Sequence, residues 1–432
     1  MAAAEPSLEL VALVVDDQVL TRELEGQCAL PSIPDGAGWT DLTTVVATSG
    51  DPGAIPVSPI RRLETEPRRF LHVLGGSGEA AHHQGRWLNR RGLDRLAEPP
   101  EVVAALALAM DEVSGRAPAP AYRPDWYRLG WRDEVDQWVD DRLAELGRTR
   151  TGPSTVLKLW SLSAVLRIPC GSSAVYVKAT CDWFRAEPRI TQALAGFAGP
   201  HLPTVLAVDV TRAWMLMEPL PGVDDSNPPS LAVPAARVLA ELQQASIAHT
   251  ADLVAAGCPD RGLAATLAAL HEVITESVEL RLLEPEQRAA ARRMETWLAA
   301  QVTELYGCGL PITISHGDLH LGNIAYDGTD LAIFDWTDAC LTHPFLDAAH
   351  LVQSHGVERP DQVWATFAES WLQVCPEADV GRARELAPLV NQVFQTISYE
   401  GIFRHREPAA QWEMTGIVAR NLRELAERHA AS

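Results

Sequence analysis

Cysteine is scarce in this 432-residue chain, and its seven cysteines are scattered without a C-x-x-C pair. That distribution argues against a disulfide framework and against a zinc site. The sequence also lacks an apolar run long enough to span a bilayer, and its N-terminus carries acid where a secretory signal carries basic residues. We therefore expect a cytoplasmic protein with reduced cysteines and no membrane partner.

Positive charge is also in short supply. The chain holds 36 Lys and Arg residues against 57 Asp and Glu residues, so its formal net charge is −21. An acidic surface of this kind disfavours nucleic acid and anionic lipid as partners. It tolerates a cationic small molecule, although solubility alone also explains it. The sequence does not indicate an oligomeric state.

The most informative segment lies late in the chain. Residues 314–324 read Ile-Ser-His-Gly-Asp-Leu-His-Leu-Gly-Asn-Ile, and residues 334–336 read Phe-Asp-Trp. Asp318 stands five residues before Asn323, and Asp335 follows twelve residues later. A carboxylate that receives a hydroxyl proton, an amide that holds a metal and a second carboxylate that chelates the metal are the groups used in phosphoryl transfer from a nucleotide. The sequence therefore predicts kinase chemistry.

The pattern of elements divides the chain into four segments. Residues 1–115 read as a small α/β accessory domain, with early strands and a helix over 101–113. Residues 30–60 are punctuated by Gly and Pro, so strands and loops are expected there. Residues 116–150 form a Pro/Ala linker and a docking helix. Three strand runs and a helix follow in residues 151–221, and residues 222–432 are mostly helical, with a last helix expected over 409–430.

The first segment vaguely resembles a Nudix domain in the order of its strands and helix. A Nudix hydrolase needs a clustered Arg-Glu-x-x-Glu-Glu arrangement, and residues 20–70 supply none. The resemblance thus implies at most a degenerate Nudix-like domain. An unrelated accessory domain is the alternative.

Residues 151–432 resemble the aminoglycoside phosphotransferase and choline kinase superfamily. The resemblance is carried by Val177-Lys178, Glu187, Met217-Glu-Pro-Leu-Pro-Gly222, the segments 316–323 and 334–336, and His343-Pro-Phe-Leu-Asp347. It implies an α+β, bilobal protein-kinase-like fold, with a small β-rich N-lobe in residues 151–221 and a large helical C-lobe in residues 222–432, preceded by the small α/β domain. The chain lacks the H-R-D, D-F-G and A-P-E forms, which disfavours a protein kinase.

The same resemblance assigns the catalytic and metal-binding residues. Asp318 is expected to orient the acceptor hydroxyl and receive its proton, while Asn323 and Asp335 are expected to hold Mg²⁺ on ATP. Lys178 is expected to contact the nucleotide phosphates, and Glu187 to hold Lys178 as an ion pair. An edge lysine that reaches solvent is the alternative for Lys178.

Two further regions complete the expected site. No G-x-G-x-x-G loop is present, so Ser161 or Ser163 would contact phosphate, unless this segment is an ordinary hairpin turn. Adenine would be read beside the hinge, and the hinge candidates are Met217 and Leu220. Four residues are candidates for binding the acceptor, with a solvated helix face as the alternative for each: Asp338, Tyr399, Glu400 and Arg404.

The leading hypothesis is an ATP- and Mg²⁺-dependent kinase that phosphorylates a small hydroxylated molecule, such as an aminoglycoside, another amino sugar or a cationic alcohol. The alternative is a catalytically weak pseudokinase or nucleotide-binding regulatory protein.

Overall fold

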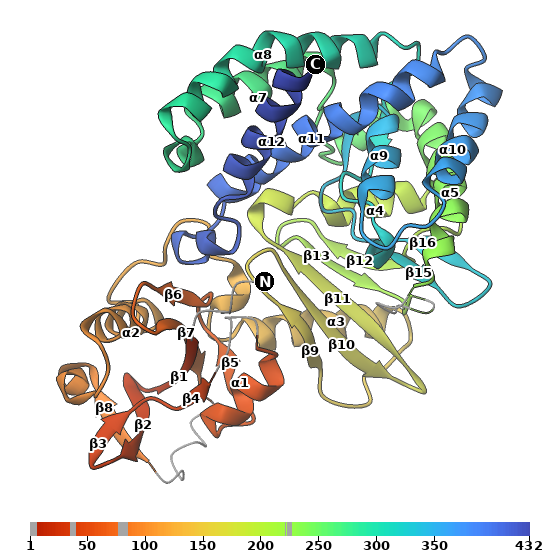
Figure 1. Ribbon diagram of the computed structural model, residues 1–432. Helices are drawn as coiled ribbons and strands as arrows, with labels where there is room; N and C mark the ends of the chain where they lie inside the picture. Colours follow the sequence, from red (N-terminus) through yellow and green to blue (C-terminus); the bar gives the residue numbers. More distant parts are fainter. Residues whose placement is uncertain (1–6, 35–39, 77–84, 221, 223–226) are drawn as a thin grey trace. The chain divides into compact units, whose positions relative to one another are not determined.

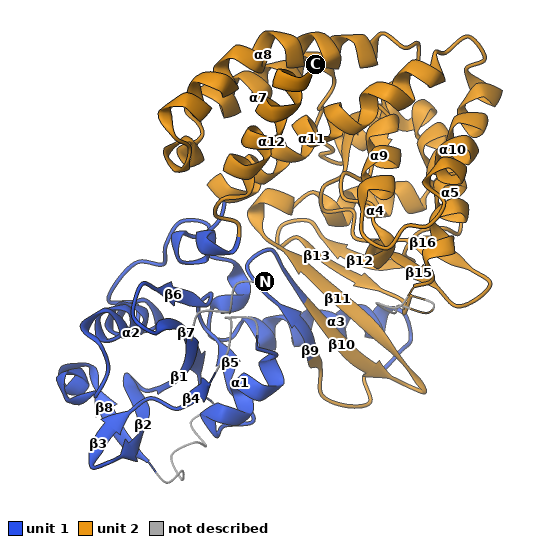
Figure 2. Ribbon diagram, in the orientation of Figure 1, with its two compact units in different colours: residues 1–149, 156–164, 405–413 blue, residues 150–155, 165–404, 414–432 orange. Residues whose placement is uncertain are grey.

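The computed structural model describes residues 7–34, 40–76, 85–220, 222 and 227–432, and it divides into two compact units (Figures 1 and 2). Unit 1 comprises residues 1–149, 156–164 and 405–413. Unit 2 comprises residues 150–155, 165–404 and 414–432. Among the described residues, no helix is both long and apolar enough to cross a membrane.

Unit 1 is built on a mixed sheet. Its central strands, β1 (Ser7–Val15) and β7 (Arg68–Gly75), run parallel and are almost entirely buried, as expected for strands covered on both faces. The remaining strands are β2 (Gln18–Leu24), β3 (Gln27–Ala29), β4 (Ser32–Pro34), β5 (Ile55–Pro56), β6 (Arg61–Leu63) and β8 (Arg86–Asn89). Their order is β3-β2-β1-β7-β5, with β4 also paired to β1, β6 to β7 and β8 to β2.

The described residues of unit 1 form the helices α1 (Leu42–Ser49), α2 (Pro100–Val113) and α3 (Trp131–Glu145). Helix α2 begins with proline at its first position, where the missing N–H costs nothing, and buries Val102, Leu106 and Met110 against the sheet core. Helix α1 corrects the sequence analysis, which expected only strands and loops in residues 30–60. The first six residues of the predicted α/β segment lie outside the described residues.

Unit 2 opens with antiparallel strands that carry the nucleotide-binding candidates. The strands β10 (Ser163–Cys170), β11 (Ser173–Thr180), β13 (Trp214–Met217) and β12 (Val205–Asp209) lie side by side in that order. Helix α4 (Glu187–Ala195) follows β11 in the chain and contributes Ile190 and Leu194 to the core of unit 2. Strand β9 (Thr155–Leu159) lies mostly in unit 1.

The rest of unit 2 is mainly helical (Figure 1). Its helices are α5 (Ala232–Ser246), α6 (Thr250–Ala255), α7 (Leu263–Glu276), α8 (Pro285–Tyr306), α9 (Phe345–Gln353), α10 (Pro360–Val374), α11 (Val380–Arg404) and α12 (Ile417–Ala431). Two short antiparallel strand pairs interrupt them: β14 (Thr313–Ser315) with β17 (Cys340–Thr342), and β15 (Ile324–Tyr326) with β16 (Leu331–Ile333). A β-rich part followed by a helical part confirms the predicted α+β class.

The predicted helix over residues 409–430 is wrong in one respect. The structure has a 3₁₀ segment at Pro408–Glu413 and a separate helix, α12, that begins at Ile417. Gly416 precedes α12 with φ +92°, a left-handed conformation that interrupts the helix. The interruption also marks a boundary between units, since residues 405–413 belong to unit 1.

Candidate active site

The loop between β14 and β15 carries Asp318 and Asn323, and its shape depends on Gly317. Gly317 has φ +83°, and a Cβ atom placed there would lie 2.4 Å from the backbone oxygen of Asp338. A side chain would therefore be strained in its backbone and would collide with the segment that follows Asp335. Glycine at this position allows the two segments of the site to approach each other.

A buried carboxylate at the start of α9 fixes the same loop. Asp347 is 1% exposed. Its Oδ1 accepts hydrogen bonds from Ser315 Oγ at 2.6 Å and Gly317 N at 2.9 Å, and its Oδ2 accepts from His316 N at 2.8 Å and Gln243 Nε2 at 3.0 Å. Four donors satisfy the buried charge, so Asp347 clamps the loop backbone to the helical core.

His316 links the loop to the strand that leads to Asp335. Its Nε2 donates to Phe334 O at 2.9 Å, and its Nδ1 accepts from Asp318 N at 3.3 Å. Both contacts suit a neutral imidazole, and burial lowers the pKa of His316. His316 thus joins the Asp318 backbone to the Phe-Asp-Trp segment.

Asp318 itself is half exposed and is held from two sides. Asn323 Nδ2 donates to the backbone oxygen of Asp318 at 2.8 Å. His350 Nε2 lies 3.0 Å from Asp318 Oδ1, and His320 Nε2 lies 3.8 Å from Asp318 Oδ2. Since 41% of the Asp318 side chain stays exposed, an acceptor hydroxyl can reach its carboxylate.

Lys178 joins the two parts of unit 2. Its Nζ lies 2.6 Å from Glu187 Oε1 on α4 and 2.6 Å from Asp335 Oδ1 after β16. Burial alone would lower the pKa of Lys178, because it disfavours the charged ammonium. The carboxylates of Asp335 and Glu187 outweigh burial and raise the pKa of Lys178 above its ordinary value. Burial raises the pKa of Glu187, although Lys178 opposes that shift. The structure therefore brings the three residues together as a charged triad with Lys178 in its cationic form.

The charges of this triad fit a nucleotide with a divalent cation. One ammonium faces two carboxylates, which leaves an excess negative charge beside Asp335. The amide of Asn323 donates to Asp318 through Nδ2, so its Oδ1 stays an acceptor. A carboxylate and an amide oxygen suit Mg²⁺, which is usually held by one or two protein groups together with phosphates. No cluster of three or more His, Cys, Asp or Glu side chains able to hold a metal occurs among the described residues.

Two of the four acceptor candidates lie in the electrostatic field of Asp318. Burial raises the pKa of Asp338 to about 7, and the nearby carboxylates of Asp318 and Asp335 add to that shift. Burial likewise raises the pKa of Tyr399, with smaller contributions from Asp318 and Asp338. The Asp318 side of the site is therefore strongly acidic, which disfavours an anion and favours a cation.

The other two candidates are engaged in contacts between helices. Glu400 is buried and accepts hydrogen bonds from Ser277 Oγ and Arg404 Nε, both at 2.6 Å. Arg404 also pairs with Glu272 on α7. These contacts fix α11 within the helical part and leave the acceptor role of both residues a prediction.

The structure does not place the remaining nucleotide candidates against Lys178. Ser161 and Ser163 belong to unit 1, where Ser161 Oγ donates to Glu413 Oε2 at 2.7 Å and Ser163 Oγ accepts from Trp160 Nε1 at 2.9 Å. Met217 ends β13 and is buried, and Leu220 follows it in the chain. Their contacts with a nucleotide remain predictions.

The sequence analysis did not identify His350, whose Nε2 lies 3.0 Å from Asp318 Oδ1. A signal was available, because His350 stands three residues after Asp347 on α9. Residues at this spacing share a helix face, so a helix that turns Asp347 toward the loop also turns His350 toward it.

Comparison with known proteins adds a family relationship. A family model described as the phosphotransferase enzyme family matches residues 159–386, which is more than half of the chain. The match begins after the α/β segment, so it does not bear on the Nudix resemblance. No curated protein matches the chain.

Solved structures with a similar fold include two bacterial proteins. A choline/ethanolamine kinase family protein from Mesorhizobium loti is 17% identical, with a TM-score of 0.43, over 69% of this chain and 92% of its own. A macrolide 2′-phosphotransferase from Brachybacterium faecium is 15% identical, with a TM-score of 0.46, over 65% of this chain and 98% of its own. At these values the likeness carries no conclusion about substrate.

Proposed function

Because the chain belongs to the phosphotransferase enzyme family, we propose that it transfers a phosphoryl group from ATP to a hydroxyl group of a small cationic molecule. Family membership makes the chain a small-molecule kinase. The observation that carries the finer proposal is the triad of Lys178, Glu187 and Asp335, whose ammonium lies 2.6 Å from each of the two carboxylates.

The triad supports nucleotide binding. Lys178 is buried and held by two partners, so its position is set before a phosphate binds. Its side chain therefore loses little conformational entropy on binding. Asn323 and Asp335 supply the oxygen atoms that would hold Mg²⁺. When bound, Mg²⁺ would supply charge neutralisation for the phosphates, which is the main requirement of phosphoryl transfer.

Asp318 supports the role of a base. A donor on His350 Nε2 would hold one carboxylate oxygen in place, while the exposed remainder of the carboxylate would orient the acceptor hydroxyl and receive its proton. The bond formed joins the acceptor oxygen to phosphorus, and the bond broken joins that phosphorus to the ADP oxygen.

The acidic surroundings of Asp318 support a cationic acceptor. Asp338 and Tyr399 lie in the same electrostatic field, and neither supplies a positive charge to an incoming molecule. An amine on the acceptor would compensate these carboxylates. We therefore propose an aminoglycoside, another amino sugar or a cationic alcohol as the substrate class.

The test is a transfer assay with γ-labelled ATP and Mg²⁺. The acceptor panel pairs each amino sugar with a neutral sugar of the same ring size. We expect label in amine-bearing acceptors, and a loss of at least about 100-fold in Asp318→Asn. Asp330→Asn, which changes an exposed carboxylate in the turn before β16, should keep the wild-type rate. Labelling only of neutral sugars would contradict the proposed substrate class, and full activity in Asp318→Asn would contradict the assignment of the base.

A further inference from the structure

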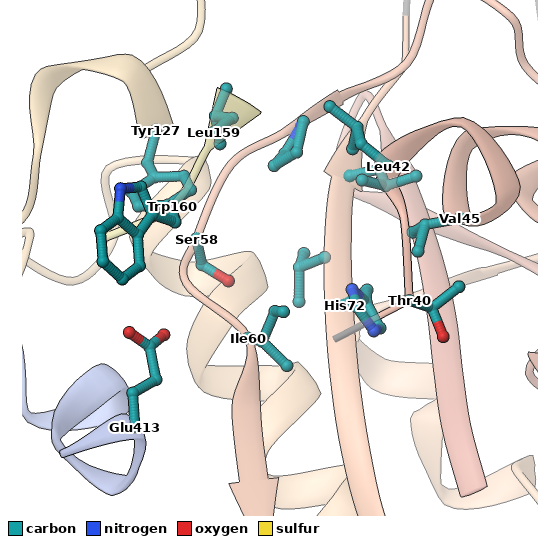
Figure 3. A pocket seen from close by; sticks show the side chains of 13 residues that line it. Thr40, Leu42, Val45, Ser58, Ile60, His72, Tyr127, Leu159, Trp160 and Glu413 are labelled. Carbon is teal, nitrogen blue, oxygen red and sulfur yellow. The ribbon is translucent and has the colours of Figure 1, made fainter. Parts of the chain in front are cut away.

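Unit 1 contains a cavity of about 200 Å³ that the proposed phosphoryl transfer does not use (Figure 3). Its walls come from α1, from the sheet around β7, and from the segments that carry Tyr127, Trp160 and Glu413. All of its lining residues belong to unit 1. We propose that this cavity is a binding site for a neutral, flat, single-ring molecule that carries two hydrogen-bond donors.

The size of the cavity sets the size of the ligand. An apolar cavity of about 150 Å³ in a protein interior accommodates benzene. A volume of about 200 Å³ therefore accommodates one ring with small substituents, and excludes a nucleotide or an oligosaccharide.

The walls of the cavity favour a flat, mostly apolar body. Leu42 and Val45 of α1 line one part, and Ile60 lines another. Two aromatic rings, those of Tyr127 and Trp160, complete the lining, and aromatic rings pack best on other flat rings. The indole of Trp160 is already oriented, because its Nε1 donates to Ser163 Oγ at 2.9 Å. A ring held in place before binding loses little entropy when a ligand arrives.

One side of the cavity offers a buried acceptor on β7. His72 is 7% exposed, and its Nε2 lies 2.6 Å from Glu9 Oε2, while Glu9 Oε1 accepts from Thr40 Oγ1 at 2.9 Å. Because Nε2 donates to the carboxylate of Glu9, Nδ1 is the ring nitrogen left to contact a ligand. Among the described residues, none donates a hydrogen bond to that nitrogen. A hydroxyl or amino group on a ligand would satisfy it.

The opposite side offers a second acceptor (Figure 3). Glu413 Oε2 accepts from Ser161 Oγ and from Arg406 Nη1, both at 2.7 Å. Glu413 Oε1 receives no hydrogen bond from the described part of the chain, although the side chain is only 4% exposed. A donor on the ligand would give this oxygen a hydrogen bond that the described residues do not provide.

The charges around the cavity favour a neutral ligand. An anion would meet carboxylates on both sides, and the guanidinium of Arg406 already pairs with Glu413. A cation would have to leave water for the carboxylate of Glu413, which Arg406 already compensates. Uncharged hydroxyl or amino donors avoid both costs.

Three probes of nearly the same size test this inference on the full chain. Resorcinol carries two donors on one ring, m-xylene replaces both hydroxyl groups by methyl groups, and 3-hydroxybenzoate replaces one hydroxyl by a carboxylate. Ligand-detected NMR titration measures binding of each. We expect saturable binding of resorcinol, and at least tenfold weaker binding of m-xylene and of 3-hydroxybenzoate, because each loses at least one buried hydrogen bond.

Two variants separate this cavity from other surfaces. Leu42→Trp places a large side chain into it from the partly exposed start of α1, and Ile60→Trp fills it from the other wall. Thr43→Trp adds the same indole to the exposed face of α1 and serves as the control. Resorcinol binding should be lost in both filling variants and kept in the control. Unchanged binding in a folded filling variant, or no saturable binding in wild type, would overturn the proposal.

Discussion

At the scale of single residues, the contact between His350 and Asp318 has a direct consequence for catalysis. The imidazole holds one oxygen of the carboxylate at 3.0 Å, and among the hydrogen bonds of the described residues it has none with Asn323 or Asp335. His350 therefore acts on the orientation of the base rather than on nucleotide binding.

His350→Leu should consequently lower kcat by about 10-fold while leaving the KM for ATP unchanged, since a misplaced base affects only the transfer step. His350→Gln, whose amide can still donate to Asp318, should recover part of the rate. His355→Gln changes an exposed histidine two residues beyond α9 and should have no effect. A rise in the KM for ATP with unchanged kcat would contradict the positioning role.

The raised pKa of Asp338 predicts how the stability of the folded chain depends on pH. The pKa of Asp338 in the folded chain is raised from 3.8 to about 7, because its partly exposed carboxyl group loses hydration and lies near the charges of Asp318 and Asp335. The folded state thus binds a proton that the unfolded state releases, and stability falls as the pH rises from about 4 through 7.

Asp338→Asn keeps the shape of the side chain and removes the charge. At pH 8.5 the variant should exceed wild type in free energy of unfolding by about 2–4 kcal/mol, and at pH 4 the difference should be small. Urea unfolding at the two pH values measures it, with Asp330→Asn as the exposed control. A variant that is less stable than wild type at pH 8.5 would contradict the raised pKa.

At the scale of elements, the loop between β14 and β15 depends on one backbone conformation. Gly317 and Gly130 share φ +83°, yet a Cβ at Gly317 meets a backbone oxygen at 2.4 Å, whereas one at Gly130 meets nothing within 4 Å. Comparing alanine variants of these two glycines therefore distinguishes the free-energy cost of a left-handed conformation from the additional cost of a steric collision.

Gly130→Ala should lower the free energy of unfolding by about 1 kcal/mol, the usual cost of a left-handed alanine. Gly317→Ala should cost at least about 1 kcal/mol more and should also reduce kcat, because the segment of Asp338 must move. Thermal unfolding and steady-state kinetics check both. Equal losses in the two variants would show that the close approach at Gly317 is not rigid.

The elements also show what the sequence can and cannot predict. Helix α8 lies within the segment predicted to be mostly helical, and Pro285 opens it and Gly307 follows it. Helix α1 was missed because Gly and Pro punctuate residues 30–60, and because its β-branched Thr43, Thr44 and Val45 favour strands. Its helix is set instead by its ends: Asp41 caps the first turn, and Gly50 closes the last turn with φ +81°.

The candidate site likewise contains some residues that the sequence predicts and others that it does not. The spacing of Asp318, Asn323 and Asp335 is local, so the motif predicts them. Partners that arrive from another helix, such as His350 and Asp347 on α9, depend on packing that no local pattern contains. Lys178 and Glu187 were predicted as a pair, whereas the second carboxylate on Lys178 comes from Asp335, 157 residues away in the chain.

At the scale of the whole molecule, unit 1 is discontinuous in sequence. Residues 405–413, which lie between α11 and α12 in the chain, are packed inside it. Glu407 is fully buried and accepts from Arg123 at 2.6 and 2.9 Å, and Trp412 Nε1 donates to Ile60 O at 2.9 Å. Glu407 and Trp412, which lie late in the chain, therefore have hydrogen-bond partners that are encoded before residue 150.

A shortened chain of residues 150–432 should for this reason be much less stable than the full chain. Removing Arg123 leaves the carboxylate of Glu407 without its cation, and loss of a buried partner usually costs about 3–5 kcal/mol. Thermal unfolding of the two chains measures the difference. A shortened chain with the melting temperature of the full chain would show that residues 405–413 do not need unit 1.

Binding of the nucleotide phosphates by Lys178 can be tested directly, because the chain contains few lysines. Lys158 and Lys178 are the only lysines in the sequence, and Lys158 is exposed while Lys178 is 7% exposed. An ATP derivative with an acyl group on its terminal phosphate transfers that group to a lysine held beside the phosphates, and mass spectrometry identifies the modified residue. We predict rapid modification of Lys178 that excess ATP suppresses, and slow modification of Lys158 that ATP does not change. Modification of Lys158 alone, or of Lys178 at a rate that ATP leaves unaltered, would contradict the claim.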